Sequence, residues 1–328
     1  MKLGQDYPKI VEYPYGMLSN NIQLYVDEPC HNASEWNNNF SALLRQLLRD
    51  HPINVCCEDR VVITENIRIP IRIYRPLQSE NEILPIMYFI HGGGWEKGDL
   101  ETHDYECRSI CAGVPCVVVA IDYRVTPTFK FPAGLEDCYR ILLWIHDHAA
   151  SFGGDPTKIC IGGDSAGGNY SVAVCMLAHE RSGPAITRQI LIYPALDMSD
   201  TDHGSYVMYC GDNPVGQDTI RVQKEACEFL FHQYVNDPVE LLLPLVSPLL
   251  AEDVSYMPPA TFILGQCDVL LDEGLRYAKR LGDCGIDVSW HVFDGMPHAF
   301  LQYNYPQSFE ARQVIIDELR EAFANEVY

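Results

Sequence analysis

Apolar runs alternate with amphipathic stretches along most of the chain, and this alternation predicts strands separated by helices. Residues 84–90 (Leu-Pro-Ile-Met-Tyr-Phe-Ile) are continuously apolar, which is typical of a strand buried on both faces of a parallel sheet. Similar runs predict further strands at 116–121, 158–162, 189–193, 260–264 and 288–293. Helical periodicity predicts helices at 102–112, 131–145, 169–181, 272–281 and 309–323. We therefore expect an α/β fold with a mostly parallel, doubly wound central sheet flanked by helices.

The N-terminal part of the chain departs from this alternation. Residues 1–55 have no strand pattern, but Trp36, Phe40 and four following leucines recur at helical spacing and predict an amphipathic helix. After it, period-two stretches at 61–64 and 69–74 predict a hairpin.

A second departure begins after the strand predicted at 189–193. This stretch is rich in aromatic and acidic residues, and we expect a helix over 218–234 within it. The patterns together divide the chain into an N-terminal helical cap segment (1–55), a first part of the core (56–197), a cap insertion (198–244) and a second part of the core (245–328).

The charge of this 328-residue chain narrows the classes of function. Lysine and arginine total 23, against 45 aspartate and glutamate residues, so the formal net charge is −22. This excess of negative charge excludes nucleic acid as a partner and disfavours an anionic membrane surface. The hydrophobic fraction of 47% is that of a globular protein, and the chain is long enough to bury a large core and leave a pocket.

The beginning of the sequence and the cysteines predict a cytoplasmic protein. The first residues contain no apolar stretch of the kind a signal peptide needs, and no later run is long enough to span a bilayer. The 13 cysteines are scattered and largely embedded in apolar runs, which is typical of buried, reduced thiols. No complete set of metal ligands is in view, so we expect neither a metal nor another cofactor. The oligomeric state stays open, with a homodimer as one option.

The stretch Gly163-Asp164-Ser165-Ala166-Gly167 stands between a predicted strand and a predicted helix. Its small residues suit a nucleophile elbow, because such a turn strains the backbone and brings strand and helix too close for larger side chains. Ser165 is therefore a candidate nucleophile. The pentapeptide alone is a weak signal, since small residues around a serine are also common in ordinary turns.

A serine hydroxyl becomes nucleophilic when a base takes its proton and a third group orients that base. In a known arrangement of these groups on a doubly wound sheet, the acid and the histidine follow later strands, in that order. Asp268 comes just after the strand predicted at 260–264, and we favour it over Asp272, which begins a predicted helix and so suits a helix cap. His298 follows the last predicted strand and completes the order, whereas His291 lies inside that strand.

Residues His91-Gly92-Gly93-Gly94-Trp95 directly follow the strand predicted at 84–90. Consecutive glycines allow backbone N–H groups to point into a pocket, where they can stabilise the negative oxygen of a tetrahedral intermediate. Gly93 and Gly94 are the predicted donors, together with Ala166. His91 is then expected to anchor the loop, and the alternative for the whole stretch is a flexible glycine-rich turn.

The combined motifs resemble those of the hormone-sensitive-lipase-like carboxylesterases, which have the α/β-hydrolase fold. The resemblance runs from about Leu84 to Leu301. The matching motifs are His91–Trp95, Thr102–Asp104, Asp122–Arg124, Gly163–Asn169, Ser247–Leu249, Cys267–Asp268, Asp272–Gly274 and His298–Phe300. The resemblance implies the same catalytic groups that order and spacing predict, namely the triad Ser165, Asp268 and His298 and the oxyanion hole Gly93, Gly94 and Ala166. It also implies that the segments 1–55 and 198–244 form a helical cap that lines the acyl pocket.

Three positions differ from the family pattern. After Asp122–Arg124 the family usually continues Leu-Ala-Pro-Glu, whereas this chain has Val125-Thr126-Pro127-Thr128 and lacks the carboxylate. Val269-Leu270 replaces the usual Pro-Leu, and Ala299 stands where glycine is common. None of these changes removes a catalytic group, and they concern the anchoring of the loop and the width of the pocket.

We therefore expect a serine carboxylesterase that acts on small-molecule esters with short or medium acyl chains. An amidase, a lactonase or a peptidase would use the same residues. The alternative from another class is a non-catalytic receptor, because the chain also resembles plant hormone receptors in which the triad histidine is replaced; His298 argues against it. The residues predicted to contact substrate are Trp36, Phe40, Trp95, Tyr206 and Tyr209.

Overall fold

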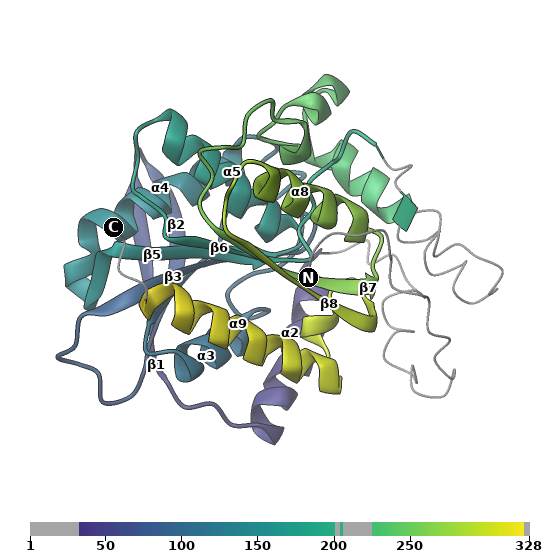
Figure 1. Ribbon diagram of the computed structural model, residues 1–328. Coiled ribbons are helices and arrows are strands. Elements are labelled where there is room, and N and C mark those ends of the chain that lie inside the picture. Colours follow the sequence, from purple (N-terminus) through teal and green to yellow (C-terminus); the bar gives the residue numbers. More distant parts are fainter. Residues whose placement is uncertain (1–32, 201–203, 206–224, 325–328) are drawn as a thin grey trace.

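The computed structural model describes residues 33–200, 204–205 and 225–324, and these residues contain one eight-stranded sheet (Figure 1). The strand order is β1-β2-β4-β3-β5-β6-β7-β8. Strands β1 and β2 form an antiparallel hairpin, β2 is antiparallel to β4, and all later neighbours are parallel. The bounds are β1 Cys56–Thr64, β2 Ile67–Arg75, β3 Leu84–Ile90, β4 Val117–Ile121, β5 Gly154–Asp164, β6 Arg188–Ile192, β7 Ala260–Cys267 and β8 Val288–Pro297. The predicted mostly parallel, doubly wound sheet is confirmed.

Helices cover both faces of this sheet. Figure 1 shows α4, α5 and α8 on one face, α3 and α9 on the other, and α2 beside α3. Their bounds are α2 Ala33–Asp50, α3 Asp104–Gly113, α4 Ala133–His148, α5 Ala166–Glu180, α8 Leu271–Asp283 and α9 Pro306–Ala324. Short 3₁₀ helices lie at η1 Ala149–Phe152, η2 Pro238–Leu242, η3 Pro248–Leu250 and η4 Phe300–Gln302. A further helix occupies 225–234, the described part of the helix predicted over 218–234.

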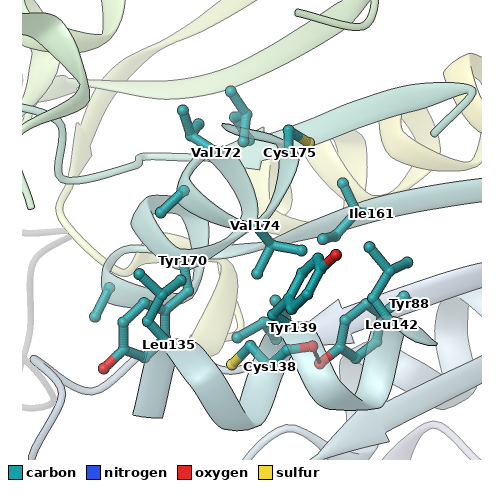
Figure 2. Close-up of a cluster of buried hydrophobic side chains, with 14 of the residues drawn as sticks. Tyr88, Leu135, Cys138, Tyr139, Leu142, Ile161, Tyr170, Val172, Val174 and Cys175 are labelled. Atoms are coloured by element: carbon teal, nitrogen blue, oxygen red, sulfur yellow. Dashed lines mark hydrogen bonds between the residues drawn. The ribbon is translucent and has the colours of Figure 1, made fainter. Parts of the chain in front are cut away.

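The continuously apolar strands are explained by burial on both faces, since successive side chains of a strand point to opposite sides. In β3, Tyr88 and Ile90 join the core beneath α4, α5 and α8, whereas Met87 and Phe89 join the core beneath α3 and α9. Figure 2 shows part of the first core, where Tyr88 meets side chains of α4 and α5. Its hydroxyl donates a hydrogen bond to the carbonyl of Cys138 at 3.0 Å, so the polar group is satisfied within the core.

The predicted elements agree with the structure apart from their ends. The helix predicted from residue 169 begins earlier, at Ala166, directly after Ser165. The glycines in this first turn have a low intrinsic helix propensity, which is why the pattern predicted a later start. Packing of the turn against the sheet stabilises the helix there. The turn of the β1–β2 hairpin contains Glu65 and Asn66 with positive φ angles of 48° and 69°, which suits the twist of a hairpin.

The described ranges also bear on the expectations for membrane-spanning segments and for the cysteines. Across residues 33–200, 204–205 and 225–324, no helix combines the length and apolar character needed to cross a membrane. The cysteines of the same ranges are all free, and most of them are buried or half-buried.

The junction of β5 and α5 lies very close to the end of β3. A Cβ atom added at Gly167 would collide with the carbonyl oxygen of Ile90 and would lie 2.6 Å from that of His91. A Cβ at Gly163 would also meet the oxygen of Ile90. These contacts involve backbone atoms, which cannot rotate away as a side chain can. Only glycine therefore fits at both positions.

We therefore expect Gly167→Ala to lower the free energy of unfolding by about 1–3 kcal/mol, since the strand and helix must separate to admit a methyl group. Gly282→Ala in α8 is the matched control. Nothing lies within 4 Å of a Cβ at that position, and alanine in a helix gains about 0.5–1 kcal/mol over glycine. Urea unfolding midpoints should move in opposite directions for the two variants. Equal urea midpoints for the two variants would contradict the close approach of α5 to the end of β3.

Candidate active site

Ser165 occupies the turn between β5 and α5 and has a strained backbone conformation, with φ 54° and ψ −117°. Hydrogen bonds on both sides fix this conformation. The N–H of Ser165 donates to the carbonyl of Ile192 at 2.8 Å, and its own carbonyl accepts from the N–H of Asn169 at 3.1 Å and from that of Ala195 at 3.3 Å. The serine side chain is thereby presented at the carboxyl end of the sheet, where ligands bind in folds of this kind.

The structure brings together the three side chains predicted as a triad. Asp268 directly follows β7, and His298 directly follows β8. Nε2 of His298 lies 2.9 Å from Oγ of Ser165, and its Nδ1 lies 2.8 Å from Oδ2 of Asp268. An ionised carboxylate can only accept, so Nδ1 carries the proton and Nε2 is left to accept the serine hydroxyl. The other oxygen of Asp268 accepts the N–H of Leu270 at 2.8 Å, which fixes the carboxylate.

The environment of His298 combines burial with a nearby negative charge. Burial lowers the pKa of His298, but the charge of Asp268 and the hydrogen bond to it raise the pKa, and the net result is a pKa above the ordinary value of 6.5. The ring of Tyr193 packs edge-on against the imidazole at a centroid distance of 5.0 Å. The imidazole is therefore held in place by a hydrogen bond on one side and by an aromatic ring on another.

The competing side chains have other partners. Asp272 lies in the first turn of α8, but the cap position is Leu270, so the expectation that Asp272 caps this helix is wrong. Its carboxylate accepts the N–H of Ser205 at 2.8 Å instead. His291, inside β8, lies 3.0 Å from the carboxylate of Glu318 in α9 and so has a partner outside the predicted triad.

The loop after β3 carries two of the three N–H groups predicted as oxyanion donors, those of Gly93 and Gly94, and the third belongs to Ala166 at the start of α5. Gly93 and Gly94 have positive φ angles of 116° and 61°, which glycine adopts without strain. The carbonyl of Gly93 accepts the N–H groups of Glu96 and Lys97, which closes a tight turn. Within the part of the chain that the structure describes, no acceptor takes the N–H of Gly93, Gly94 or Ala166.

His91 is packed inside the protein, as expected for an anchor of this loop. Its ring stacks on Tyr123 at a centroid distance of 4.2 Å, and the hydroxyl of Tyr123 donates to the carbonyl of His91 at 2.9 Å. Burial, followed by the charge of His103, lowers the pKa of His91 to about 4. The ring is therefore neutral at physiological pH.

The structure also explains how the 125–128 segment is held without the carboxylate found in the family pattern. The N–H of Thr126 donates to the carbonyl of Trp95 at 2.8 Å, and its hydroxyl donates to the same oxygen at 3.3 Å. Threonine thus ties this segment to the loop that carries Gly93 and Gly94.

The residues predicted to contact substrate have different environments. Trp95 is 2% exposed and stacks on Tyr234 of the helix 225–234 at 4.4 Å. Phe40 is buried in a cluster with Tyr105 of α3. Trp36 is half-buried, and Nζ of Lys97 lies 5.9 Å from its ring centre. Tyr206 and Tyr209 lie outside the described residues.

Leu230 lies beside the predicted oxyanion hole, although it was not among the residues predicted to contact substrate. A Cβ added at Gly94 would lie 2.5 Å from Cδ1 of Leu230, so the leucine side chain contacts the glycine directly. Helical periodicity placed Leu230 in a helix, but no sequence signal indicated that this helix packs over Gly94.

A serine hydroxyl, an imidazole and a carboxylate that contact one another in this order are the arrangement typical of serine hydrolases. Among residues 33–200, 204–205 and 225–324, no group of three or more histidine, cysteine, aspartate or glutamate side chains could hold a metal ion.

Comparisons with known proteins identify the family. A family model described as the alpha/beta hydrolase fold matches residues 87–302. Carboxylic ester hydrolase LipN of Mycobacterium tuberculosis is 38% identical over 239 residues, which cover 71% of this chain and 61% of LipN, so the match spans less than two thirds of that relative. The arylesterase of Saccharolobus solfataricus is 32% identical over 292 residues, 87% of this chain and 91% of the arylesterase.

A solved structure agrees with these sequence matches. An esterase from the hyperthermophilic archaeon Pyrobaculum calidifontis superimposes with a TM-score of 0.82 and 31% identity, covering 92% of this chain and 98% of the esterase. The chain belongs to the hormone-sensitive-lipase-like family of α/β hydrolases. The resemblance stated from the sequence motifs is therefore confirmed at the level of the family.

The contact between Asp268 and His298 leads to a prediction for the pKa of the imidazole. In the native protein an NMR titration of His298 should give a pKa above 6.5. Asp268→Asn should lower it, because the negative charge that favours the imidazolium is removed. Asp272→Asn is the matched control, since Asp272 bonds to Ser205 and not to His298. A pKa unchanged by Asp268→Asn would contradict the assigned contact.

Proposed function

We propose that this protein is a serine carboxylesterase in which Ser165 is the nucleophile, His298 the general base and Asp268 the group that orients the base. The observation that carries the proposal is the continuous pair of contacts from Ser165 Oγ to His298 Nε2 (2.9 Å) and from His298 Nδ1 to Asp268 Oδ2 (2.8 Å). The names of the relatives, carboxylic ester hydrolase and arylesterase, support an ester substrate.

The reaction follows from the direction of these hydrogen bonds. His298 takes the hydroxyl proton at Nε2 while Oγ of Ser165 bonds to the carbonyl carbon of the ester. The tetrahedral intermediate collapses, the carbon–oxygen bond to the alcohol breaks, and the imidazolium returns the proton to the leaving oxygen. Water then attacks the acyl-enzyme with the same base, which releases the carboxylic acid and restores the serine. Asp268 stabilises the imidazolium that forms twice in this cycle.

The N–H groups of Gly93, Gly94 and Ala166 form the proposed oxyanion hole. They belong to two segments, the loop after β3 and the first turn of α5, which the close approach at Gly167 holds side by side. Their freedom from other acceptors in the described residues supports the role, because a preorganised donor stabilises the intermediate without first breaking another bond.

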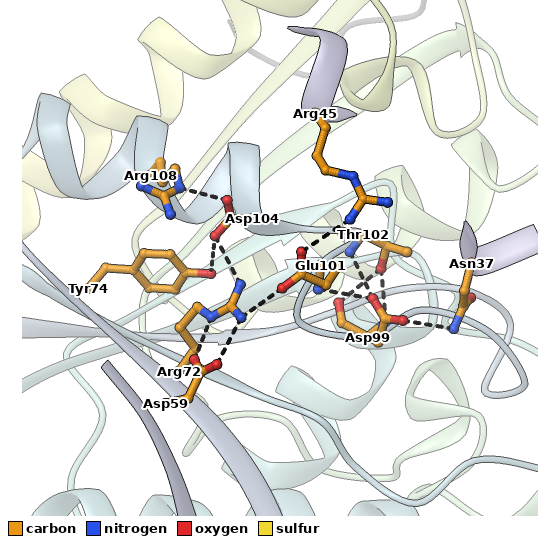
Figure 3. Close-up of polar contacts among 10 residues, drawn as sticks. All are labelled: Asn37, Arg45, Asp59, Arg72, Tyr74, Asp99, Glu101, Thr102, Asp104 and Arg108. Atoms are coloured by element: carbon orange, nitrogen blue, oxygen red, sulfur yellow. Dashed lines mark hydrogen bonds and ion pairs between the residues drawn. The ribbon is translucent and has the colours of Figure 1, made fainter. Parts of the chain in front are cut away.

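Two helices form the proposed cap over this site. Figure 3 shows the contacts of α2, in which Asn37 reaches Asp99 and Arg45 reaches Glu101. The side-chain oxygen of Asn37 also accepts the N–H of Gly98 at 3.0 Å, at the end of the glycine loop. On the other side, the helix 225–234 places Leu230 against Gly94. The cap segments therefore contact the oxyanion loop from two directions.

We infer a preference for short or medium acyl chains from the position of Leu230. Its side chain narrows the space beside Gly94, where the carbonyl group of a bound ester would lie. An amidase, lactonase or peptidase would use the same residues and is separated by substrate profiling. The non-catalytic receptor alternative is disfavoured, because His298 is present and contacts both Ser165 and Asp268.

Replacement of the proposed nucleophile tests the assignment. Ser165→Ala should lower kcat for a chromogenic acetyl ester by at least about 10⁴-fold, because no other group can form the acyl-enzyme. It should also abolish labelling by a fluorophosphonate, with an unchanged circular dichroism spectrum. Ser109→Ala in α3 is the control, since its hydroxyl bonds to the carbonyl of Tyr105. Full turnover by Ser165→Ala would refute the assignment.

A truncated side chain at 230 tests the proposed acyl pocket. Leu230→Ala should raise kcat/KM for a longer acyl chain relative to acetate by about tenfold, because it removes the side chain beside Gly94. Phe229→Ala on the same helix is the control, since Phe229 is 63% exposed. The measurement is a series of p-nitrophenyl esters with increasing acyl length. An unchanged preference in Leu230→Ala would place the acyl chain elsewhere.

A further inference from the structure

Asp164, which precedes Ser165, is buried at a point where three other segments meet. Its Oδ1 accepts the N–H of Gly92 at 2.8 Å and lies 3.1 Å from Nε2 of His103. Its Oδ2 accepts from Nε2 of Gln302 at 3.1 Å. Asp164, His103 and Gln302 are 3%, 2% and 4% exposed, so water does not compete for these hydrogen bonds.

The proton between His103 and Asp164 can be assigned from chemistry. An ionised carboxylate can only accept, so Nε2 of His103 carries a hydrogen atom directed at Asp164. Nδ1 of the same ring lies 2.9 Å from the hydroxyl of Thr102. This hydroxyl accepts the N–H of Asp99 and donates to the carbonyl of Asp99, and the backbone N–H of Thr102 donates to the Asp99 carboxylate (Figure 3). The ring is therefore fixed at both nitrogen atoms.

Charges around this pair favour its ionised form. Burial lowers the pKa of His103, but the charge of Asp164 and the hydrogen bond raise it overall, with smaller contributions from Glu106 and Asp99. His91 faces the same ring at a centroid distance of 5.6 Å. Burial raises the pKa of Asp164, but His103 and the N–H of Gly92 lower it overall.

The partners of Asp164 belong to segments that carry the groups of the proposed active site. Gly92 directly precedes the proposed donors Gly93 and Gly94. Gln302 lies in η4, which follows His298 in the chain. One carboxylate thus connects the oxyanion loop, the nucleophile turn and the histidine loop.

We propose that Asp164 is a positioning residue that holds the oxyanion loop and the His298 loop in place relative to Ser165. The inference rests on the proposed function, because it concerns the same reacting groups. Asp164 contacts none of the reacting atoms itself. It acts through Gly92 and Gln302, and His103 supplies the counter-charge that allows a carboxylate to be buried there.

The charge of Asp164 has a second effect that a purely structural group would lack. Among the described residues, the charged groups that act on His298 are Asp268 and, more weakly, Asp164, and both raise the pKa of His298 against the effect of burial. Loss of the charge at 164 should therefore move the acid limb of the rate profile to lower pH, since a base with a lower pKa stays neutral in more acidic solution.

Two substitutions separate these effects in the full-length protein. Asp164→Ala removes all three hydrogen bonds and should lower kcat for an acetyl ester by about 10- to 100-fold, with little change in KM, since a small displacement of reacting groups has an effect of this size. Asp164→Asn keeps an oxygen that can accept the N–H of Gly92, so it should lower kcat by a smaller factor than Asp164→Ala. Both should shift the acid limb of kcat/KM to lower pH.

Glu318→Gln is the matched control. It removes a histidine–carboxylate contact of similar length, 3.0 Å between Glu318 and His291, that involves none of the groups of the proposed site. It should leave kcat and the acid limb at their native values. Gln302→Ala provides a milder test in case the Asp164 variants fail to fold, and it should lower kcat without moving the acid limb.

The outcomes distinguish this inference from the proposed function. If Ser165→Ala is inactive while the folded Asp164 variants keep the native kcat and acid limb, only the positioning role is refuted. If the Asp164 variants do not fold and Gln302→Ala does, a native kcat of Gln302→Ala refutes the positioning role. If Ser165→Ala remains active, the proposed function itself is wrong, whatever the Asp164 variants do.

Discussion

The contact between the backbone of β3 and the first turn of α5 is the constraint on which the site depends. The carbonyl oxygen of Ile90 occupies the space that a side chain at 163 or 167 would need. Because strand and helix meet so closely, the strained turn at Ser165 lies directly beside the loop that follows β3. The proposed donors Ala166, Gly93 and Gly94 therefore lie in adjacent segments, although more than 70 residues separate Ala166 from the two glycines in the chain.

Two carboxylates, those of Asp268 and Asp164, lie at this end of the sheet, and each is paired with a histidine. Asp268 holds His298 in one tautomer and stabilises its charged form. Asp164 directly precedes the serine, is paired with His103, and accepts hydrogen bonds from Gly92 and Gln302. Burial makes each of these hydrogen bonds stronger than it would be in water, and it also makes an unpaired charge costly. Both carboxylates accordingly have hydrogen-bond donors.

The sequence was sufficient to predict the sheet, the order of its elements and the side chains that meet at its carboxyl end. Continuous apolar runs mark strands that are buried on both faces, and the chain order of Ser165, Asp268 and His298 follows from their places after successive strands. Side-chain packing between distant segments was not predictable. No pattern in the sequence indicated that Trp95 stacks on Tyr234 or that Leu230 packs against Gly94. No role for Asp164 followed from the pentapeptide, because its partners at 92, 103 and 302 come together only in the fold.

The covalent intermediate is the most direct test of the account. The protein would be mixed with an excess of an acetyl ester that has a good leaving group, quenched in acid within milliseconds, digested and analysed by mass spectrometry. The account predicts an acetyl group on the peptide that contains Ser165, formed in a burst and lost when the substrate is exhausted. An acetyl group on a different residue, or rapid turnover with no modified peptide, would contradict it.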